Sequence, residues 1–300
     1  MTENTINDKH FTAETVAKYD TPVTFRQGRE VVLNILRYKN DRLAPSTTKG
    51  NADGVNAFWA GKRVLDFACG TGITSLNLAP HVGKVVGIDI SDEMLGVFKQ
   101  KLKSNENHNV SAHLINLLEE DDETMKAKAG PGELFNFDAV VSSLAYHHID
   151  DIDAASRAIY HQLNPKGGWA FVADLAKDTV NVVEKTSPQV PHPTGFSGAD
   201  FAKTFEQAGF VNIDSSYSFV VDEIWDTEER ISWFGKHHAL SQDLPPLESD
   251  KHLSPLAKGL NKEIEGVRVY DVNPHPENGG PPLYMYRMKF NLAVGQRLEE

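Results

Sequence analysis

The stretch Val64-Leu65-Asp66-Phe67-Ala68-Cys69-Gly70-Thr71-Gly72 decides the fold class of this chain. It joins an apolar run, typical of a buried strand, to a turn of small residues, where glycine lets the backbone adopt positive φ and approach a ligand closely. Twelve residues later a second apolar run begins, and it ends on the acid Asp89. The spacing predicts a strand over 63–68, a helix over about 71–80 and a strand over 84–89, which together form a βαβ unit able to hold a nucleoside.

Strands and helices continue to alternate after this unit. The apolar patterns predict further strands over 110–115, 137–142, 168–173, 211–221 and 283–292, and further helices over 92–103, 151–163 and 199–208. Alternation of this kind favours an α/β fold with a doubly wound sheet. The sequence contains no internal repeat.

Two regions stand outside the alternating pattern. Residues 1–57 contain two predicted helices, over 11–19 and 25–37, and a polar loop over 40–57. Residues 222–281 form an insertion between the last two predicted strands, with a predicted helix followed by polar and Pro-rich stretches. That helix carries Trp225, Ile231, Trp233 and Phe234. We expect both regions to supply helical lid elements over a main domain of residues 58–300.

Composition limits the classes of partner. The chain has 300 residues, 40% of them hydrophobic, which is enough for an ordinary core. A formal net charge of −12 is a poor match to nucleic acid, which binds basic surfaces. The single cysteine, the absence of an apolar run of roughly 18 to 20 residues and the polar start of the chain predict a cytoplasmic protein with no membrane span.

The glycine turn itself distinguishes between nucleoside ligands. A dinucleotide fingerprint continues with a third glycine, but here that position is Ser75. An acid, Asp66, also precedes the two glycines, where it can face a cation directly or through water. Both features favour a ligand with an ammonium group over one that presents a pyrophosphate.

With these motifs in place, the chain resembles the class I S-adenosylmethionine-dependent methyltransferases. The resemblance is to the small-molecule branch that includes the ubiquinone and menaquinone biosynthesis methyltransferases, and it covers roughly residues 60 to 175. It rests on VLDFACGTG at 64–72, VVGIDIS at 85–91, FDAVVSSLAYHHIDD at 137–151 and LNPKGGWAFV at 163–172. It implies a Rossmann-like, seven-stranded mixed sheet with an antiparallel final strand, and S-adenosylmethionine as the cofactor.

The resemblance also implies which residues hold the cofactor. The methionine part would lie against Asp66, Ser143 and the backbone of Ala68, Cys69, Gly70, Thr71 and Gly72. Asp89 would bind the ribose hydroxyls, and Ile90, Met94, Asn116 and Leu117 would surround the adenine. The family often has an acid where this chain has Asn116, whose side-chain oxygen can still accept a hydrogen bond from the adenine amino group. It also often has a glycine at the position of Ala68.

Candidate catalytic residues follow the fourth predicted strand. His147 and His148 sit at the carboxyl edge, where doubly wound sheets bind ligands, and an imidazole titrates in the useful range. His148 aligns with a histidine common in the family. Some phosphoamine-methylating relatives pair that histidine with a tyrosine of the N-terminal helix, which corresponds to Tyr19. We therefore expect Tyr19 and His148 to flank the acceptor, with a base needed only if the nucleophile carries a proton.

Each of these side chains also has a structural interpretation. Cys69 suits the turn as a small residue, and one of His147 and His148 can pack in the core or cap the helix that follows. His237 and His238 diverge around a helix, which disfavours a shared metal, so no metal is predicted. The aromatic residues at 225, 233 and 234 can be core or pocket lining, and the acidic run 119–123 is most simply a solvated loop.

The sequence thus predicts an enzyme that methylates a small organic metabolite on O, N, S or C by in-line displacement. Two other functions stay open at this point. The acceptor could be a basic peptide of a protein, which the acidic composition would tolerate, or the chain could bind the cofactor as a regulatory or scaffold protein without catalysis. The attacking atom, the acceptor and the oligomeric state are not specified by any motif.

Overall fold

The structure of the chain is a computed structural model. It describes residues 12, 16–17, 19–44, 54–104, 108–177, 190–225, 261–264, 267–271 and 284–299. Its strands are β1 (Arg63–Phe67), β2 (Lys84–Asp89), β3 (Val110–Leu114), β4 (Ala139–Ser143), β5 (Lys166–Leu175), β6 (Val211–Trp225), β7 (Asn261–Ile264), β8 (Val267–Asp271) and β9 (Tyr284–Leu298). Its main helices are α3 (Pro22–Arg37), α4 (Ile73–Leu78), α5 (Asp92–Ser104), α6 (Asp122–Ala129), α7 (Ile152–Gln162) and α8 (Gly198–Ala208).

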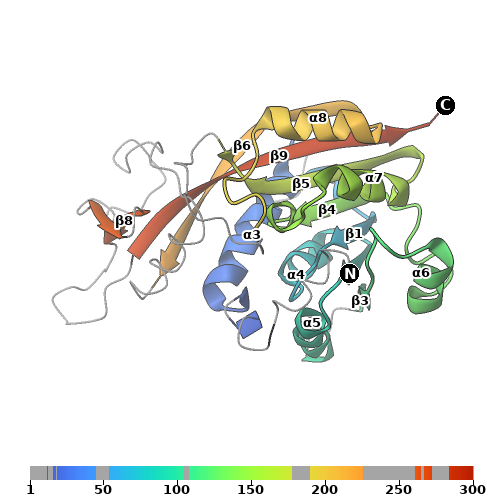
Figure 1. Cartoon of the computed structure of the whole chain (residues 1–300), viewed down its shortest axis with the longest axis horizontal. Helices are drawn as coiled ribbons and strands as arrows, with labels where there is room; N and C mark the ends of the chain where they lie inside the picture. The colour runs from blue at the N-terminus through green and yellow to red at the C-terminus, as the bar shows by residue number, and fades with distance from the viewer. Residues whose placement is uncertain are drawn as a thin grey trace.

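All of these strands belong to one mixed sheet (Figure 1). Strands β3, β2, β1, β4 and β5 are neighbours in that order and run parallel. Strand β9 is antiparallel to both β5 and β6. These seven strands confirm the predicted seven-stranded mixed sheet with its antiparallel final strand. The short hairpin β7–β8, which pairs with the beginning of β9, is an addition that the sequence pattern did not indicate.

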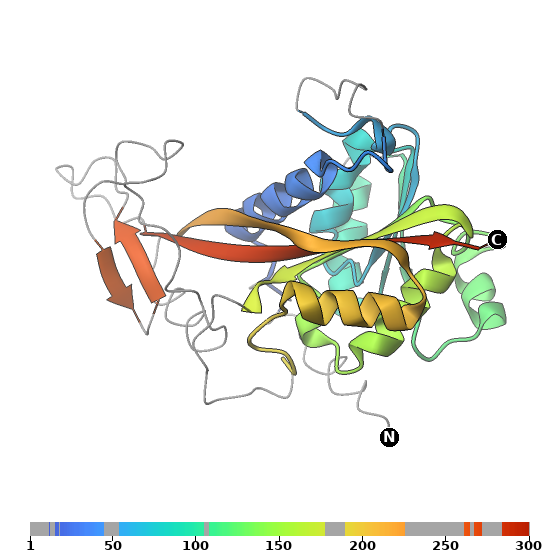
Figure 2. The ribbon, with the colours of Figure 1, turned by 90° about the horizontal axis from the view of Figure 1, so that it is seen from above.

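Helices cover both faces of the sheet, as Figure 2 shows for α3 and α4 on one face and α7 and α8 on the other. The first core holds buried residues of α3, such as Val31 and Ile35, against Val64 of β1 and Phe171 of β5. The second core packs α7 and α8 against the opposite face. Alternate residues of the central strands point into one core or the other, which is why β1, β2, β4 and β5 are mostly apolar.

The order of the parallel strands fixes where a ligand can bind. Strand β1 lies between β2 and β4, so the chain turns to one side after β1 and to the other side after β4. The loops that leave the carboxyl ends of β1 and β4 therefore diverge and leave a crevice, as in other open α/β sheets. The glycine turn and the His147–His148 turn both lie at this edge.

Helix α3 begins at Pro22, three residues before the predicted start at residue 25. The Thr21 hydroxyl accepts a hydrogen bond from the Thr24 backbone N–H, and the Thr24 side chain accepts one from the Thr21 backbone N–H. This capping box satisfies backbone donors that the helix itself leaves unpaired. The segment just before α3 is therefore held in a defined conformation.

Two sequence-based predictions are wrong. The acidic run at 119–123 is not simply a loop, because α6 begins at Asp122 and the Asp121 side chain accepts the Thr124 N–H as its cap. Acids at a helix start are stabilised by the helix dipole, a signal that we interpreted only as solvation. Trp225 is the last residue of β6 rather than part of a helix.

Other predicted features lie outside the described residues: Phe11, Ile231, Trp233, Phe234, His237 and His238. Of the predicted N-terminal helix, the structure describes helical backbone at residues 16, 17 and 19. Among the described helices, none has the length and apolar character needed to cross a bilayer.

Candidate functional site

A cavity of about 230 Å³ lies at the carboxyl edge of the sheet. Its walls come from four parts of the chain: the segment before α3 with α3 itself, the glycine turn after β1 with the start of α4, the end of β2 with α5, and the turn after β4. The loops after β1 and β4 are the ones that diverge at the reversal in strand order, and the other two parts border the same crevice. The cavity therefore collects residues that are far apart in sequence.

The glycine turn has the backbone geometry that its sequence predicts. Gly70 and Gly72 adopt φ of 53° and 81°, and Ala68 adopts 58°, a left-handed conformation that favours glycine. A side chain at Gly72 would collide with the Phe98 ring of α5, only 2.1 Å from the place of a Cβ atom. A Cβ at Gly70 would meet nothing within 4 Å. The turn is thus tight on the α5 side and open at Gly70, which lines the cavity.

Asp89 lies at the cavity wall with both carboxylate oxygens held by backbone. One oxygen accepts the Gly70 N–H at 2.7 Å and the other accepts the Ser91 N–H at 2.9 Å. Burial raises the pKa of Asp89, while these backbone hydrogen bonds lower it in part. Each carboxylate oxygen has a second lone pair. Asp89 can therefore bind hydroxyl groups of a ligand while it links the ends of β1 and β2.

Asp66 occupies a different position from the one expected. It is 1% exposed, lies behind the turn and is not among the residues that line the cavity. The Ser75 hydroxyl donates to its carboxylate at 2.6 Å. Burial raises the pKa of Asp66 to about 7, against the lowering effect of the Ser75 hydrogen bond. Ser75, the residue in place of a third glycine, is thus the polar partner of this acid.

The remaining expected cofactor residues divide into two groups. Ile90, Met94 and Ser143 line the cavity, as do Ala68, Cys69 and Thr71. Gly72, Asn116 and Leu117 do not line it. The Asn116 side-chain oxygen accepts the Leu118 N–H at 3.1 Å, so it already has a partner in its own loop.

The two adjacent histidines face different environments. His148 lines the cavity together with Leu144, Ala145 and Ile149, all from the turn after β4. His147 is 4% exposed and turns away, with its Nδ1 atom 2.7 Å from the buried carboxylate of Asp174. The helix that follows is capped by Asp151 and not by either histidine. Of the pair, His148 is the residue that can reach a ligand.

The N-terminal segment forms the opposite wall. Tyr19 and Thr24, with Gln27 and Gly28 of α3, line the cavity. The Thr24 hydroxyl donates to the Tyr19 carbonyl at 2.8 Å, so the capping box also holds Tyr19. Burial raises the pKa of Tyr19, which keeps its phenol protonated and able to donate. The structure thus brings Tyr19 and His148 to the same cavity.

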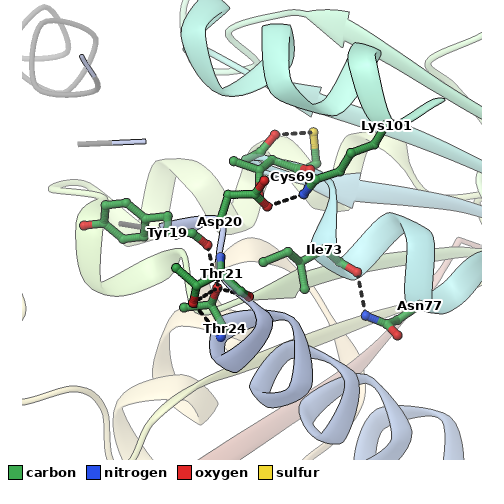
Figure 3. Close-up of polar contacts among 10 residues, drawn as sticks. Tyr19, Asp20, Thr21, Thr24, Cys69, Ile73, Asn77 and Lys101 are labelled. Carbon is green, nitrogen blue, oxygen red and sulfur yellow. Dashed lines mark hydrogen bonds and ion pairs between the residues drawn. The ribbon is translucent and has the colours of Figure 1, made fainter. Parts of the chain in front are cut away.

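A charged contact ties this segment to the glycine turn (Figure 3). The Lys101 ammonium of α5 forms an ion pair with Asp20 and donates to the Thr71 carbonyl at 3.0 Å. The Thr71 hydroxyl donates to the same Asp20 oxygen at 3.2 Å. Asp20 directly follows Tyr19, so one ion pair links a cavity wall residue to the turn. We call residues 19–24 the strap.

Sequence reasoning missed three polar residues of this region. Asp174 lies within the apolar strand β5, and an acid there was a signal that a buried partner exists. Lys101 gave no signal, because an exposed face of a helix commonly carries lysines. Gln27 lines the cavity and its amide nitrogen donates to Met288 Sδ at 3.3 Å, a contact 261 residues away in sequence.

Known proteins that are similar to this chain are methyltransferases. The methyltransferase domain family matches residues 41–215. An uncharacterized methyltransferase of Schizosaccharomyces pombe is 31% identical over 236 residues, which cover 69% of this chain and 80% of that protein. The ubiquinone biosynthesis O-methyltransferase of Paraburkholderia phymatum is 32% identical over 161 residues, 52% of this chain and 64% of its own length.

Solved structures share the fold at low identity. The YcgJ protein of Bacillus subtilis has a TM-score of 0.53 at 16% identity, covering 92% of this chain and all of that one. Phosphoethanolamine N-methyltransferase 2 of Haemonchus contortus has a TM-score of 0.53 at 15% identity, covering 99% of this chain and 60% of that one. From the family match, the sheet order and the glycine turn beside Asp89, it follows that this chain belongs to the class I S-adenosylmethionine-dependent methyltransferases.

Proposed function

We propose that this methyltransferase transfers a methyl group to a small organic metabolite that binds between Tyr19 and His148. The observation that carries the proposal is the single cavity that joins the glycine turn, Asp89, His148 and Tyr19. The names of the quinone-methylating relatives support the substrate class, although the P. phymatum enzyme is matched over less than two thirds of its length.

The cavity wall fits S-adenosylmethionine. The backbone of the turn at 68–72 would hold the methionine part with Ser143, and the Asp89 carboxylate would accept the ribose hydroxyls. Ile90 and Met94 offer apolar surface for the adenine. Asp66 acts from behind the turn, where its negative form favours a cation on the other side. For Asn116 and Leu117, a role beside the adenine stays a prediction from the sequence.

Apolar side chains also line the cavity, among them Ile73 of α4 and Leu144, Ala145 and Ile149 of the turn that carries His148. Such walls favour an acceptor with an apolar or aromatic body and a polar group that reaches Tyr19 or His148. When bound, the cofactor supplies an electrophilic methyl group on a positive sulfur. Positioning of the acceptor then lowers the activation free energy by on the order of 7 to 11 kcal/mol. His148 accepts the proton of an acceptor that attacks as a hydroxyl, thiol or amine.

We further propose that two segments form a lid over the cavity of the domain of residues 58–300. They are the N-terminal residues 1–57 and the insertion between the last two strands, predicted at 222–281. The strap supports the N-terminal half of that assignment, because it closes one side of the cavity. A cytoplasmic location stays a prediction from the composition, and cell fractionation would check it.

Cofactor binding is tested by calorimetry with S-adenosylmethionine and S-adenosylhomocysteine. We expect Asp89→Ala to weaken binding by about tenfold or more, because a charge-assisted hydrogen bond contributes roughly 1.5 to 3 kcal/mol. The exposed acid Asp92, three residues on, provides the control Asp92→Ala, which should leave the affinity unchanged. Unchanged affinity in folded Asp89→Ala would contradict the ribose assignment.

The acceptor class is tested with methyl-labelled cofactor and fractionated cell extract. Label in the small-molecule fraction supports the proposal. Label in protein indicates a protein methyltransferase, and no label in any fraction indicates a regulatory or scaffold protein. With the acceptor identified, replacement of both Tyr19 and His148 should reduce turnover, and full turnover in that double variant would remove both from the acceptor site.

A further inference from the structure

The buried carboxylate of Asp174 on β5 does not line the cavity, and no step proposed above uses it. It is 0% exposed and lies in a strand that is otherwise apolar around it. An ionised carboxylate in such a place is costly unless its hydrogen bonds are satisfied. The hydrogen-bond partners of Asp174 therefore indicate the role of this carboxylate.

Among the described residues, Asp174 has three hydrogen-bonding contacts, and two of them are with His147. Oδ2 accepts the backbone N–H of His147 at 3.1 Å, and Oδ1 lies 2.7 Å from the His147 Nδ1 atom. Oδ1 also accepts the Leu175 N–H at 2.7 Å. Burial favours the neutral acid, but the neighbouring His147 ring and these hydrogen bonds hold the pKa of Asp174 below its usual value. The ionised carboxylate is acceptor only, so His147 Nδ1 carries the proton.

The other side of His147 is fixed as well. Its carbonyl oxygen accepts the His192 backbone N–H at 3.2 Å, and the next N–H, that of His148, donates to the Ala145 carbonyl at 3.0 Å. The carbonyl of His147 and the N–H of His148 belong to one planar peptide unit. Because both ends of this unit are bound, the point from which the His148 side chain leaves the backbone is fixed.

The backbone of this turn is strained at its start. Leu144 adopts φ of 56°, a left-handed conformation that is unfavourable for a residue with a side chain. The His147 and His148 rings also pack on each other, with centroids 4.1 Å apart and planes at 41°. A shift of the His147 ring would therefore be passed to His148.

We propose that Asp174 is a positioning residue that acts through His147 to set the His148 imidazole against the acceptor. The proposal rests on the assignment of His148 to the acceptor end of the cavity. It gives the adjacent histidines separate tasks: His147 is the anchor bonded to Asp174, and His148 faces the ligand. Nothing in it requires Asp174 or His147 to touch substrate.

The test uses the full chain with ¹⁵N-labelled histidine, and it reads the ring signals of His148 by NMR with S-adenosylhomocysteine present. His148→Gln identifies those signals. We expect Asp174→Asn and His147→Ala to shift them, because both remove the anchor. His147→Asn keeps a side-chain N–H in place of Nδ1 and should restore signals close to those of the parent protein. Asp153→Asn, at a carboxylate that contacts Thr204 on α8, is the control.

Affinity for S-adenosylhomocysteine separates positioning from general damage. Asp89 and Gly70 line the cavity from the segments after β2 and β1 and, within the part of the chain that the structure describes, have no hydrogen bond to Asp174 or His147, so we expect the affinity of Asp174→Asn to stay within about twofold of the parent protein. Once an acceptor is known, Asp174→Asn should lower kcat by about tenfold or more with a smaller change in KM. His147→Asn should recover most of that loss.

Unshifted His148 signals in both Asp174→Asn and His147→Ala would overturn the proposal. So would His147→Asn signals as disturbed as those of His147→Ala, since a purely steric role for His147 would give that result. If Asp174→Asn does not fold, the two His147 variants decide alone. Failure of the methyl-transfer assay with His148 signals that respond as expected would overturn the proposed function and not the positioning role.

Discussion

At the scale of the residue, two positions of the glycine turn depart from what their neighbours suggest. Ala68 stands where the family often has glycine, and it adopts positive φ all the same. Asp66 is an acid with no cation bonded to it among the described residues, and it accepts a hydrogen bond from the Ser75 hydroxyl. The positive φ of Ala68 and the burial of the Asp66 carboxyl both affect the free energy of unfolding, and unfolding experiments can measure both effects.

Asp66 should make stability depend on pH. Its pKa is about 7 in the folded protein against 3.8 for the free side chain, so the folded state keeps a proton that the unfolded chain loses between about pH 4 and pH 7. The free energy of unfolding therefore falls as pH rises through this window. Asp66→Asn should remove on the order of 2 to 3 kcal/mol of the change between pH 5 and pH 8. Urea unfolding at both pH values measures it.

The exposed acid Asp92 gives the matched substitution Asp92→Asn, which should leave the pH dependence as it is in the parent protein. An Asp66→Asn variant with the parent pH dependence would show that the carboxyl group is not protonated in the folded state.

Ala68→Gly should raise the free energy of unfolding by up to about 1 kcal/mol, because glycine adopts φ of 58° without the steric cost that alanine bears. Ala127→Gly, at an exposed position inside α6, is the contrasting change and should lower it by about 0.5 to 1 kcal/mol. Thermal or urea unfolding of the two variants compares the signs. A loss of stability in Ala68→Gly equal to that of Ala127→Gly would contradict the strained turn.

At the scale of the element, the cavity depends on how closely α3 approaches α4. A Cβ atom at Gly28 would lie 2.3 Å from the Cγ2 atom of Ile73, so only glycine lets α3 come this near. The capping box sets where α3 begins, and the strap then continues from its first turn to Asp20. The wall that carries Tyr19 is thus placed by one helix contact and one ion pair.

Lys101→Met should loosen the strap, because it removes the ion pair to Asp20 and the bond to the Thr71 carbonyl. Both charged side chains are about a quarter exposed, at 22% and 27%, so the loss of global stability should be no more than about 1 kcal/mol. Hydrogen exchange of peptides that cover residues 19–27 should become faster. Lys103→Met, on an exposed position of the same helix, should leave that exchange rate unchanged. Equal exchange in both variants would show that the strap is held by its capping box alone.

At the scale of the whole molecule, the long antiparallel strands β6 and β9 are connected by the insertion between the last two strands of the predicted pattern. The paired residues reach Trp225 and Tyr284, so the insertion runs over 226–283 rather than the predicted 222–281. All described residues that line the cavity lie outside that range. The seven strands outside this insertion, and the cavity residues assigned to the cofactor, should therefore form without residues 226–283.

Replacement of residues 226–283 by Asn-Gly removes β7 and β8 but should leave the other seven strands of the sheet intact, because Asn-Gly forms the tight turn that joins directly opposed strand ends. We expect affinity for S-adenosylhomocysteine within about threefold of the parent protein and, if this segment is part of a lid, loss of turnover with the acceptor. Calorimetry and the label assay measure the two effects. Loss of cofactor binding in a folded variant would show that the segment belongs to the cofactor site.

The alternating strands and helices were predictable because their periodicity reflects burial on the two faces of a sheet, and the predicted strand over 84–89 coincides with β2. The bounds of β6 and β9 were not predicted, because both strands continue past their predicted ends as long as a neighbouring strand pairs with them. The hairpin β7–β8 was missed because its strands are only 4 and 5 residues long, too short for a clear periodic pattern.

The sequence by itself determined the sheet, the glycine turn and Asp89, because each depends on local chemistry: burial of apolar runs, positive φ at small residues and an acid at a strand end. Only the tertiary structure decided that Asp66 lies behind the turn, that His148 and not His147 faces the cavity, and that Asp20 is bonded to Lys101. Adjacent histidines look alike in sequence. The difference between them comes from Asp174, 27 residues away, whose carboxylate selects one of the two.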